Sequence, residues 1–268
     1  MIIHPRAKIN LGLNIVEKRP DGYHNLETVF YPINIHDTLE VEPSDQLNLH
    51  LSGVALEGDP NQNLVVRAWQ LLKKDYDIHP VSIRLNKAIP SQAGLGGGSS
   101  DGAFMLRLLN KMFQLEISDE ELRMKAASLG ADCPFFITDT PAYAEGIGEI
   151  LSPLSLDLSQ YHLLIIKPPV AVSTREAFAH ITPHHTDIKC KDIVKQDIRT
   201  WREQLTNDFE DSIFPQYPRL KEIKQQLYQQ GALYAAMSGS GSSLFGFFKE
   251  KPEIIDAWKD CFCSCSRS

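Results

Sequence analysis

The stretch that decides the fold of this chain reads Pro90-Ser91-Gln92-Ala93-Gly94-Leu95-Gly96-Gly97-Gly98-Ser99-Ser100-Asp101. Its glycines let the backbone approach a ligand closely and turn successive N–H groups inward. A helical pattern follows directly and extends to Met112, which adds free N–H groups and the positive end of a helix dipole. The sequence therefore predicts a phosphate-binding loop at the start of a helix.

Two common phosphate-binding motifs do not fit this loop. A P-loop requires Gly-Lys-Ser/Thr, and no lysine follows these glycines. In the dinucleotide fingerprint Gly-x-Gly-x-x-Gly, counted from Gly94 and Gly96, the third glycine falls on Ser99. A flexible loop tip is the alternative, but a tip rarely carries four glycines directly ahead of a helix.

Alternating hydrophobic residues predict strands before and after the loop. Between Lys8 and Val16, Ile9 and Leu11 fall on one face, and Lys8 and Asn10 fall on the other. Similar strand patterns cover 28–33, 38–41, 46–51, 81–85, 161–167, 234–237 and 244–248. Helical patterns cover 64–76, 118–130, 174–181, 187–201, 218–230 and a last stretch from residue 252. Hairpins followed by interleaved helices predict an α+β fold in two parts, divided within the Pro- and Ser-rich segment 151–159.

Composition excludes several classes of partner. The 268 residues include 27 Lys+Arg and 34 Asp+Glu, a formal net charge of −7 without basic blocks. Nucleic acids and anionic membranes are therefore not expected partners, whereas a small anionic ligand senses only local charges. No apolar run approaches the roughly 20 residues of a membrane span. The first residues lack a signal-peptide pattern, so the cytoplasm is the expected compartment.

The five cysteines do not predict a disulfide framework, because their number is odd and three of them crowd the last eight residues. Cys261, Cys263 and Cys265 alternate, so an extended chain would place three thiols on one face. A zinc site usually pairs Cys-x₂₋₄-Cys with distant partners, which this segment lacks. We therefore expect a frayed, reduced tail rather than a metal site.

Three further stretches narrow down which kind of phosphate-binding protein carries this loop: Ala7-Lys8-Ile9-Asn10-Leu11, Leu129-Gly130-Ala131-Asp132-Cys133-Pro134 and Met237-Ser238-Gly239-Ser240-Gly241-Ser242. Together with the glycine-rich loop, their order resembles the GHMP kinase family of galacto-, homoserine, mevalonate and phosphomevalonate kinases. Further stretches resemble the branch that acts on a cytidine diphosphate derivative of methylerythritol in the non-mevalonate isoprenoid pathway: Asp21-Gly22-Tyr23-His24, Asn63-Leu64-Val65-Val66-Arg67-Ala68 and Ala144-Glu145-Gly146-Ile147-Gly148-Glu149-Ile150-Leu151.

The resemblance covers most of the chain and implies a two-lobed α+β fold. Residues 1–152 would form a lobe like domain 2 of ribosomal protein S5, and residues 153–268 a ferredoxin-like lobe. The implied activity is that of an ATP-dependent small-molecule kinase, which transfers the γ-phosphoryl of ATP to the C2 hydroxyl of the methylerythritol moiety. The family's Lys/Asp pair falls on Lys8 and Asp132. Asp132 would accept the hydroxyl proton. Lys8 would orient Asp132 and the hydroxyl, and it would offset the negative charge that gathers between them.

The resemblance also assigns binding residues. Residues Pro90 to Ser100 would wrap the ATP phosphates, with Asn63 near the adenine. Mg²⁺ is expected with ATP; Ser99 or Ser100 could be a ligand, but the metal site stays open. The residues expected at the substrate are Asn10, Tyr23, His24, Phe178, Gly239, Ser240 and Gly241. Of these, Tyr23 and Phe178 would stack on the cytosine, and His24 would read its edge.

Each assignment has a simpler alternative. Phe178 could pack in a core, residues 239–241 could form a plain hairpin turn, and Lys8 and Asp132 could be a solvated pair. Another GHMP kinase, of the homoserine or mevalonate type, is the alternative enzyme, and a catalytically silent nucleotide sensor of the same fold is the alternative of another class. The sequence does not distinguish a monomer from a homodimer.

Overall fold

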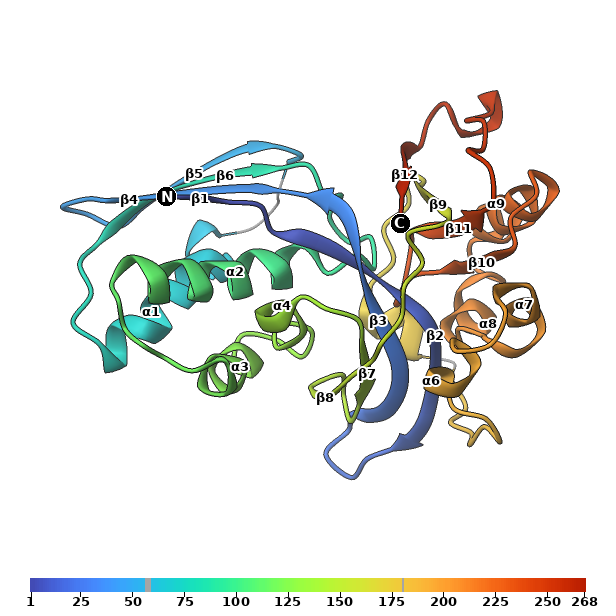
Figure 1. Ribbon diagram of the computed structural model, residues 1–268, viewed down its shortest axis with the longest axis horizontal. Helices are drawn as coiled ribbons and strands as arrows, with labels where there is room; N and C mark the ends of the chain where they lie inside the picture. The colour runs from blue at the N-terminus through green and yellow to red at the C-terminus, as the bar shows by residue number, and fades with distance from the viewer. Residues whose placement is uncertain (56–58, 180) are drawn as a thin grey trace. The chain divides into compact units, whose positions relative to one another are not determined.

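The computed structural model describes residues 1–55, 59–179 and 181–268, and it combines helices and sheets as the predicted α+β class requires (Figure 1). Its contacts divide the chain into two compact units, neither of which is continuous in sequence. Unit 1 contains residues 1–7, 35–91 and 96–140, and unit 2 contains residues 8–34, 92–95 and 141–268. The family lobes 1–152 and 153–268 stay a prediction. No described helix is long and apolar enough to span a membrane.

Unit 1 packs helices on one side of a four-stranded sheet (Figure 1). The strand order is β1 (Ile2–Ile3), β4 (Thr38–Pro43), β6 (Val81–Lys87) and β5 (Asn48–Gly53), and only the pair β5–β6 is parallel. Strand β6 forms as predicted, because every second residue from Val81 is buried. The helices are α1 (Leu64–Asp75, after the 3₁₀ turn η1, Pro60–Gln62), α2 (Gly97–Met112), α3 (Asp119–Ala127) and α4 (Phe135–Thr138).

Three buried ionisable side chains hold the start of α2 against the sheet of unit 1. Lys87, at the end of β6, donates to the carboxylate of Asp37 and lies 2.5 Å from Asp101 Oδ2, in the second turn of α2. The other oxygen of Asp37 accepts from the backbone N–H groups of Ala88 (2.6 Å) and Ile89 (2.8 Å). Buried charges are tolerated only when paired in this way. The triad therefore ties sheet and helix together at the glycine-rich loop.

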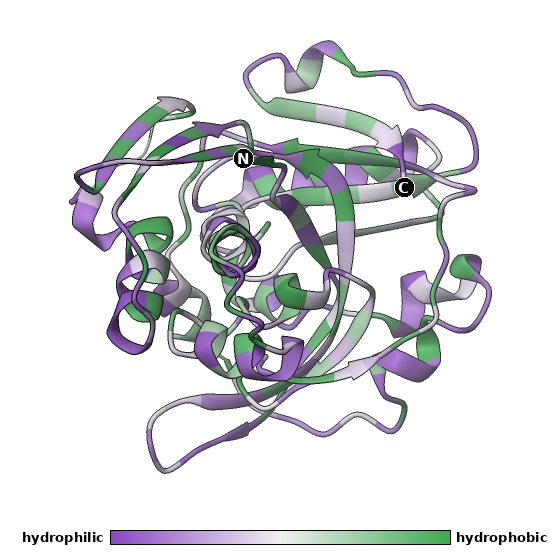
Figure 2. Cartoon of the chain, turned by 60° about the vertical axis from the view of Figure 1, so that its left-hand side comes forward, coloured by the Kyte–Doolittle hydropathy of each residue, from purple (hydrophilic) through white to green (hydrophobic). Residues whose placement is uncertain are grey.

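Unit 2 contains two further sheets. The first has the order β2 (Arg6–Lys18), β3 (His24–His36), β7 (Ala142–Glu145) and β8 (Ile150–Pro153). Strands β2 and β3 are long, and their outer ends, Arg6–Ala7 and Ile35–His36, belong to unit 1. The hairpin that joins them has a hydrophilic tip (Figure 2).

The second sheet of unit 2 has the order β10 (Tyr234–Met237), β11 (Leu244–Phe248), β9 (His162–Lys167) and β12 (Phe262–Arg267), and all neighbours are antiparallel. Counted along the chain this order is 2-3-1-4, that of a split β-α-β or ferredoxin-like sheet. Helix α9 (Pro218–Gln229) packs on β10 and β11. Between β9 and α9 lie α5 (Thr174–Phe178), α6 (Cys190–Ile193), η2 (Ile198–Thr200), α7 (Trp201–Gln204) and α8 (Phe209–Ile213). The expected ferredoxin-like sheet is confirmed.

Two expectations for the C-terminal part were wrong. The segment of Cys261, Cys263 and Cys265 is not frayed, because residues 262–267 form β12 along β9. The three free thiols are half-buried and pack against the core of this sheet. Cys263 and Cys265 alternate as small apolar residues on the inner face of β12, and Cys261 directly precedes the strand.

The predicted last helix from residue 252 is also absent from this part of the described chain, which has only the 3₁₀ turn η3 (Asp256–Trp258). The Trp258 side chain is buried and donates to Gln226 Oε1 at 2.6 Å. This tertiary contact holds the connection to β12 without a full helix. The helical pattern at 187–201 likewise forms only the short pieces α6 and η2 and the start of α7.

The buried triad should make the stability of the protein depend on pH through Asp101. Burial, opposed by Lys87 and reinforced by Asp37, raises the pKa of Asp101 from 3.8 to about 8. The folded chain then binds a proton that the unfolded chain releases, so this carboxyl's contribution to the free energy of unfolding falls as the pH rises from about 4 to about 8. Asp101→Asn keeps a neutral acceptor for Lys87 and removes the titration.

We therefore expect the Asp101→Asn protein to lose less stability than the native protein between pH 5 and pH 8, as measured by urea unfolding at each pH. The exposed Asp45 provides the control, since Asp45→Asn should follow the native curve. Equal pH slopes for the native and Asp101→Asn proteins would show that Asp101 is ionised throughout this range.

Candidate active site

The glycine-rich loop leaves the N-terminus of α2 open. The N-cap residue of this helix is Gly96, at φ +69°, so no capping side chain covers the first-turn N–H groups. Gly94 lies at φ +70°, and a Cβ added there would come within 1.9 Å of the carbonyl oxygen of Ser238. Only glycine fits at this position. The positive end of a helix of 16 residues without a side-chain cap has the features that an anion-binding site requires.

Lys8 is buried beside this loop in unit 2, with only 3% of its surface exposed. Its ammonium Nζ donates to Asn10 Oδ1 at 2.6 Å and to the Gly94 carbonyl at 3.4 Å, and it lies 4.9 Å from the centre of the Phe30 ring. Its backbone N–H donates to Leu95 O at 3.0 Å. A solvated Lys8 is therefore ruled out. The structure brings Lys8, Asn10 and Gly94 together.

Asp132 lies in unit 1, in the turn between α3 and α4, and is half-buried. The next residue, Cys133, is buried, and its thiol lies near the Ser99 side chain, in the first turn of α2. Burial, the largest effect, raises the pKa of Cys133 to about 12, so the thiol stays protonated at neutral pH. The contact places the turn that carries Asp132 beside the start of α2. The partnership of Asp132 with Lys8 stays a prediction.

The loop between β10 and β11 also reaches this cluster. Ser238 Oγ donates to Gly94 O at 2.8 Å and accepts from Asn10 N at 3.3 Å. Gly239 and Gly241 both have positive φ, and Ser240 is half-buried. Because Ser243 N also donates to Ala93 O at 3.1 Å, this loop is not a plain hairpin turn. It forms one wall of the Lys8 cluster within unit 2.

Of the residues predicted to bind the cytosine, the structure brings His24 and Phe178 into contact. Tyr23 is 60% exposed in the turn before β3. The His24 ring stacks on Phe178, with centroids 4.8 Å apart and planes 19° apart. Phe178 also makes an edge-to-face contact with the buried Phe209, so it packs on the core with one side and on His24 with another. Burial lowers the pKa of His24, and the charge of Lys18 lowers it further, which favours a neutral imidazole.

Asn63 caps a helix, and this structural role is independent of its predicted position near the adenine. It is the N-cap of α1, and its Oδ1 accepts from the N–H of Val65 at 3.1 Å. An N-cap contact of this kind stabilises the start of a helix. A function of Asn63 toward a nucleotide stays a prediction.

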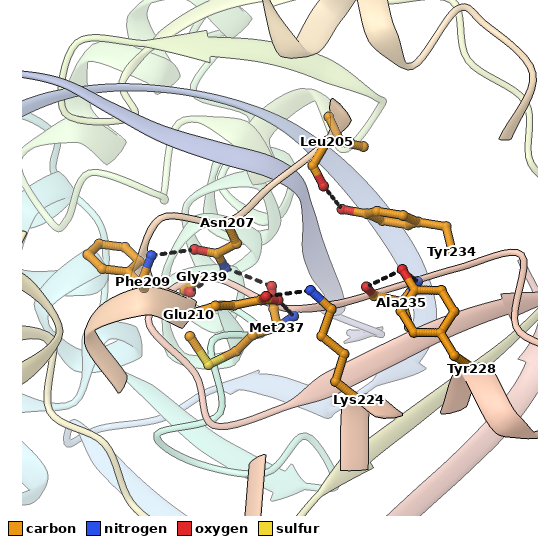
Figure 3. Close-up of polar contacts among 10 residues, drawn as sticks. All are labelled: Leu205, Asn207, Phe209, Glu210, Lys224, Tyr228, Tyr234, Ala235, Met237 and Gly239. Carbon is orange, nitrogen blue, oxygen red and sulfur yellow. Dashed lines mark hydrogen bonds and ion pairs between the residues drawn. The ribbon is translucent and has the colours of Figure 1, made fainter. Parts of the chain in front are cut away.

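Two groups of contacts at this site were not predicted from the sequence. One is the Asp37–Lys87–Asp101 triad. Lys87 falls on the inward-facing side of the alternation that begins at Val81, and a lysine at such a position is a signal that could have been used. The other is the segment Asn207–Glu210, whose side chains contact the backbone on both sides of Ser238 (Figure 3). Nothing in the local sequence pattern distinguishes this segment from an ordinary helix start.

Comparisons with known proteins agree with this arrangement. Residues 63–140 match the family "GHMP kinases N terminal domain", and residues 191–262 match "GHMP kinases C terminal". The 4-diphosphocytidyl-2-C-methyl-D-erythritol kinase of Bacteroides thetaiotaomicron is 57% identical over 98% of both chains. The protein of the same name from Parabacteroides distasonis is 50% identical over 98% of this chain and 97% of its own.

Solved structures show the same fold. A crystal structure of 4-(cytidine 5'-diphospho)-2C-methyl-D-erythritol kinase superposes with a TM-score of 0.79 at 35% identity, covering 92% of this chain and 89% of that one. The mevalonate kinase of Methanococcus jannaschii shares the fold at 14% identity, with a TM-score of 0.69 and 100% and 98% coverage. The protein is thus a small-molecule kinase, and the chain belongs to the GHMP kinase family, within its branch of 4-diphosphocytidyl-2-C-methyl-D-erythritol kinases.

Proposed function

We propose that this protein transfers the γ-phosphoryl group of ATP to the 2-hydroxyl of 4-diphosphocytidyl-2-C-methyl-D-erythritol, a step of the non-mevalonate route to isoprenoid precursors. The observation that carries the proposal is the buried ammonium of Lys8, 2.6 Å from Asn10 and 3.4 Å from the carbonyl of Gly94 in the glycine-rich loop. A buried positive charge held by the backbone of a glycine-rich loop suits a reaction between polyanions. Near-full-length identity to kinases of this name supports the substrate.

The ATP phosphates would bind along residues 94–100. The backbone N–H groups of this loop and the first turn of α2 would bind the phosphate oxygens, and the helix dipole would favour their charge. The Lys87 triad beneath the helix would keep the loop in place while the nucleotide enters and leaves. Phosphoryl transfer depends mostly on positioning and electrostatics, so a rigid loop contributes directly to the rate.

The attacking hydroxyl must lose its proton, and we assign this step to Asp132 as general base. Lys8 would orient the hydroxyl and stabilise the negative charge that gathers on the transferring phosphoryl group. Asn10 accepts a hydrogen bond from the ammonium and so directs Lys8. The end of the substrate that carries the attacking hydroxyl would also contact Gly239, Ser240 and Gly241.

The residues present are compatible with Mg²⁺ bound chiefly through ATP. Among the described residues, no group of three His, Cys, Asp or Glu side chains could form a protein cage for a metal. The buried Ser100 Oγ has no hydrogen-bond partner in the described part of the chain, and it follows Ser99 at the open helix start. Mg²⁺ commonly uses one or two protein ligands with phosphates and waters. Ser99 or Ser100 would hold it, and when bound it would neutralise β- and γ-phosphate charge.

The cytosine would stack on Tyr23 and Phe178. The stack of His24 on Phe178 leaves no space for a third ring between these two, so we propose that the His24 ring turns to the edge of the base as the cytosine replaces it. A neutral imidazole offers one donor and one acceptor, which can read the pyrimidine edge. The homoserine and mevalonate types of kinase have no comparable need for a stacking pair.

The proposed substrate is tested directly by ADP release when the cytidyl diphospho-alcohol, homoserine and mevalonate are offered in parallel. We expect turnover with the cytidyl substrate alone. Turnover with only homoserine or mevalonate would identify the alternative enzyme. ATP binding without turnover of any of the three would identify the nucleotide sensor.

Asp132→Asn should lower kcat by about 10²–10⁴-fold, because it removes the proton acceptor. The affinity for ATP should change little, as measured by calorimetric titration of the nucleotide. Asp45→Asn, which neutralises an exposed carboxylate in the same unit, is the control and should leave both values unchanged. Turnover near the native rate in Asp132→Asn would refute its role as base.

Tyr23→Ala should remove one stacking contact, which contributes about 1–3 kcal/mol of binding free energy. The KM for the cytidyl substrate should therefore rise, and the KM for ATP should stay nearly unchanged. Tyr23→Phe retains the ring and should behave like the native enzyme. Initial rates with each substrate varied in turn check both variants. Equal losses for the two substrates would indicate a general effect on folding in place of base stacking.

A further inference from the structure

We propose that Asn207 is a positioning residue for phosphoryl transfer, because its side-chain amide fixes the Ser238 loop that in turn holds Asn10, Gly94 and Lys8. The inference deepens the proposed function and rests on it. All the contacts involved lie within unit 2. Asn207 would not touch either substrate; it would act through the backbone on both sides of Ser238.

The amide of Asn207 is fully used on this loop. Its side chain is 3% exposed, and its Nδ2 donates to the carbonyls of Met237 (2.7 Å) and Gly239 (2.9 Å), which flank Ser238 (Figure 3). Its Oδ1 accepts from the N–H of Phe209 at 3.0 Å. A primary amide supplies two hydrogens from one nitrogen together with an acceptor, and neither Ser nor ionised Asp can do so. Asn207 therefore matches this pair of carbonyls.

The segment that carries Asn207 is itself fastened to strand β2. The backbone N–H of Leu13 donates to Thr206 O at 2.8 Å, and the N–H of Asp208 donates to Leu13 O at 2.9 Å. The Asp208 carboxylate accepts from the N–H of Ile15 at 2.7 Å. Strand β2 also carries Lys8 and Asn10. Asn207 thus sets the loop position relative to the same strand that holds the proposed catalytic lysine.

Glu210 also holds the start of the loop, at Met237. Its Oε1 accepts from the N–H of Met237 at 2.8 Å, and its Oε2 pairs with the ammonium of Lys224 from α9 (Figure 3). Two side chains from a four-residue segment therefore contact the N–H and C=O of Met237 and the C=O of Gly239. Ser238 lies between these anchored residues, and this constrains where its hydroxyl can be.

The position of Ser238 is coupled to Lys8 through Gly94. Ser238 Oγ donates to Gly94 O, which also accepts from Lys8 Nζ. Ser238 Oγ accepts from the N–H of Asn10, whose side chain is the other acceptor of Lys8. The backbones of Gly94 and Ser238 meet too closely for a side chain, and a shifted Ser238 would alter its hydrogen bond to the Gly94 carbonyl. Displacements of about 1 Å in positioning elements can cost on the order of 100-fold in rate.

A double-mutant cycle on kcat tests the coupling. Asn207→Ala and Ser238→Ala should each lower kcat, with a loss of about tenfold or more for Asn207→Ala. The double variant should lose little more than the larger single variant, because both changes break one chain of contacts. If Asn207→Ala does not fold, Asn207→Ser, which keeps a single donor, takes its place in the cycle.

Tyr228→Phe is the matched control. The Tyr228 hydroxyl also bonds to the backbone of β10, to the N–H and C=O of Ala235, two residues before Met237 (Figure 3). Its removal should leave kcat unchanged, and combined with Ser238→Ala it should add nothing beyond the serine's own effect. Multiplied losses for Asn207→Ala with Ser238→Ala would mean that Asn207 does not act through Ser238, and this would overturn the inference.

Amide hydrogen exchange of the ligand-free protein separates this inference from the proposed function. Asn207→Ala should speed exchange in peptides that cover 237–243 and at the N–H of Asn10, while Tyr228→Phe should not. If the native protein fails to phosphorylate the cytidyl alcohol and exchange changes as expected, the proposed function fails and the anchoring by Asn207 is upheld. If the native protein is active and exchange in these peptides is unchanged, the inference alone fails.

Discussion

The close approach of the Ser238 carbonyl to Gly94 is the constraint on which the rest of the candidate site depends. A Cβ at residue 94 would lie 1.9 Å from that oxygen, so the two loops meet backbone to backbone. This contact lets the Ser238 hydroxyl reach both Gly94 O and the N–H of Asn10. It places the carbonyl of Gly94 within reach of the Lys8 ammonium. Three segments distant in sequence are thereby joined around one buried charge.

Pairing explains how this acidic chain can bury two lysines. The net charge of −7 is a sum over the whole chain and does not show where the individual charges lie. Lys8 and Lys87 are both almost fully buried, which is costly unless each ammonium has partners. Lys87 lies between the carboxyl groups of Asp37 and Asp101 and supports the start of α2, whereas the hydrogen bonds of Lys8 to Asn10 and Gly94 hold its ammonium at the glycine-rich loop.

Much of the fold could be predicted from local pattern. Alternation predicted β2 and β6, strand patterns without alternation predicted β9 and β11, and the glycine-rich loop ahead of a helix predicted the start of α2. The pattern failed where tertiary contacts replaced it. The alternating cysteines suggested a frayed tail, because cysteine is a weak indicator of a strand. Pairing with β9 instead places Cys263 and Cys265 on the inner face of β12. The connection before β12 lacks a full helix because the buried Trp258 already anchors it to α9.

By itself, the sequence determined the α+β class, the phosphate-binding loop and the family, since these follow from short motifs and from their order along the chain. It also supplied the candidate residues Lys8, Asp132, Tyr23 and His24. Only the tertiary structure decided that Lys8 is buried and that Asn207 and Glu210 hold the Ser238 loop. It alone showed that Asp37 and Asp101 share Lys87. The physical reason is that burial and hydrogen-bond partners depend on residues far apart in sequence, whose contacts no local periodicity records.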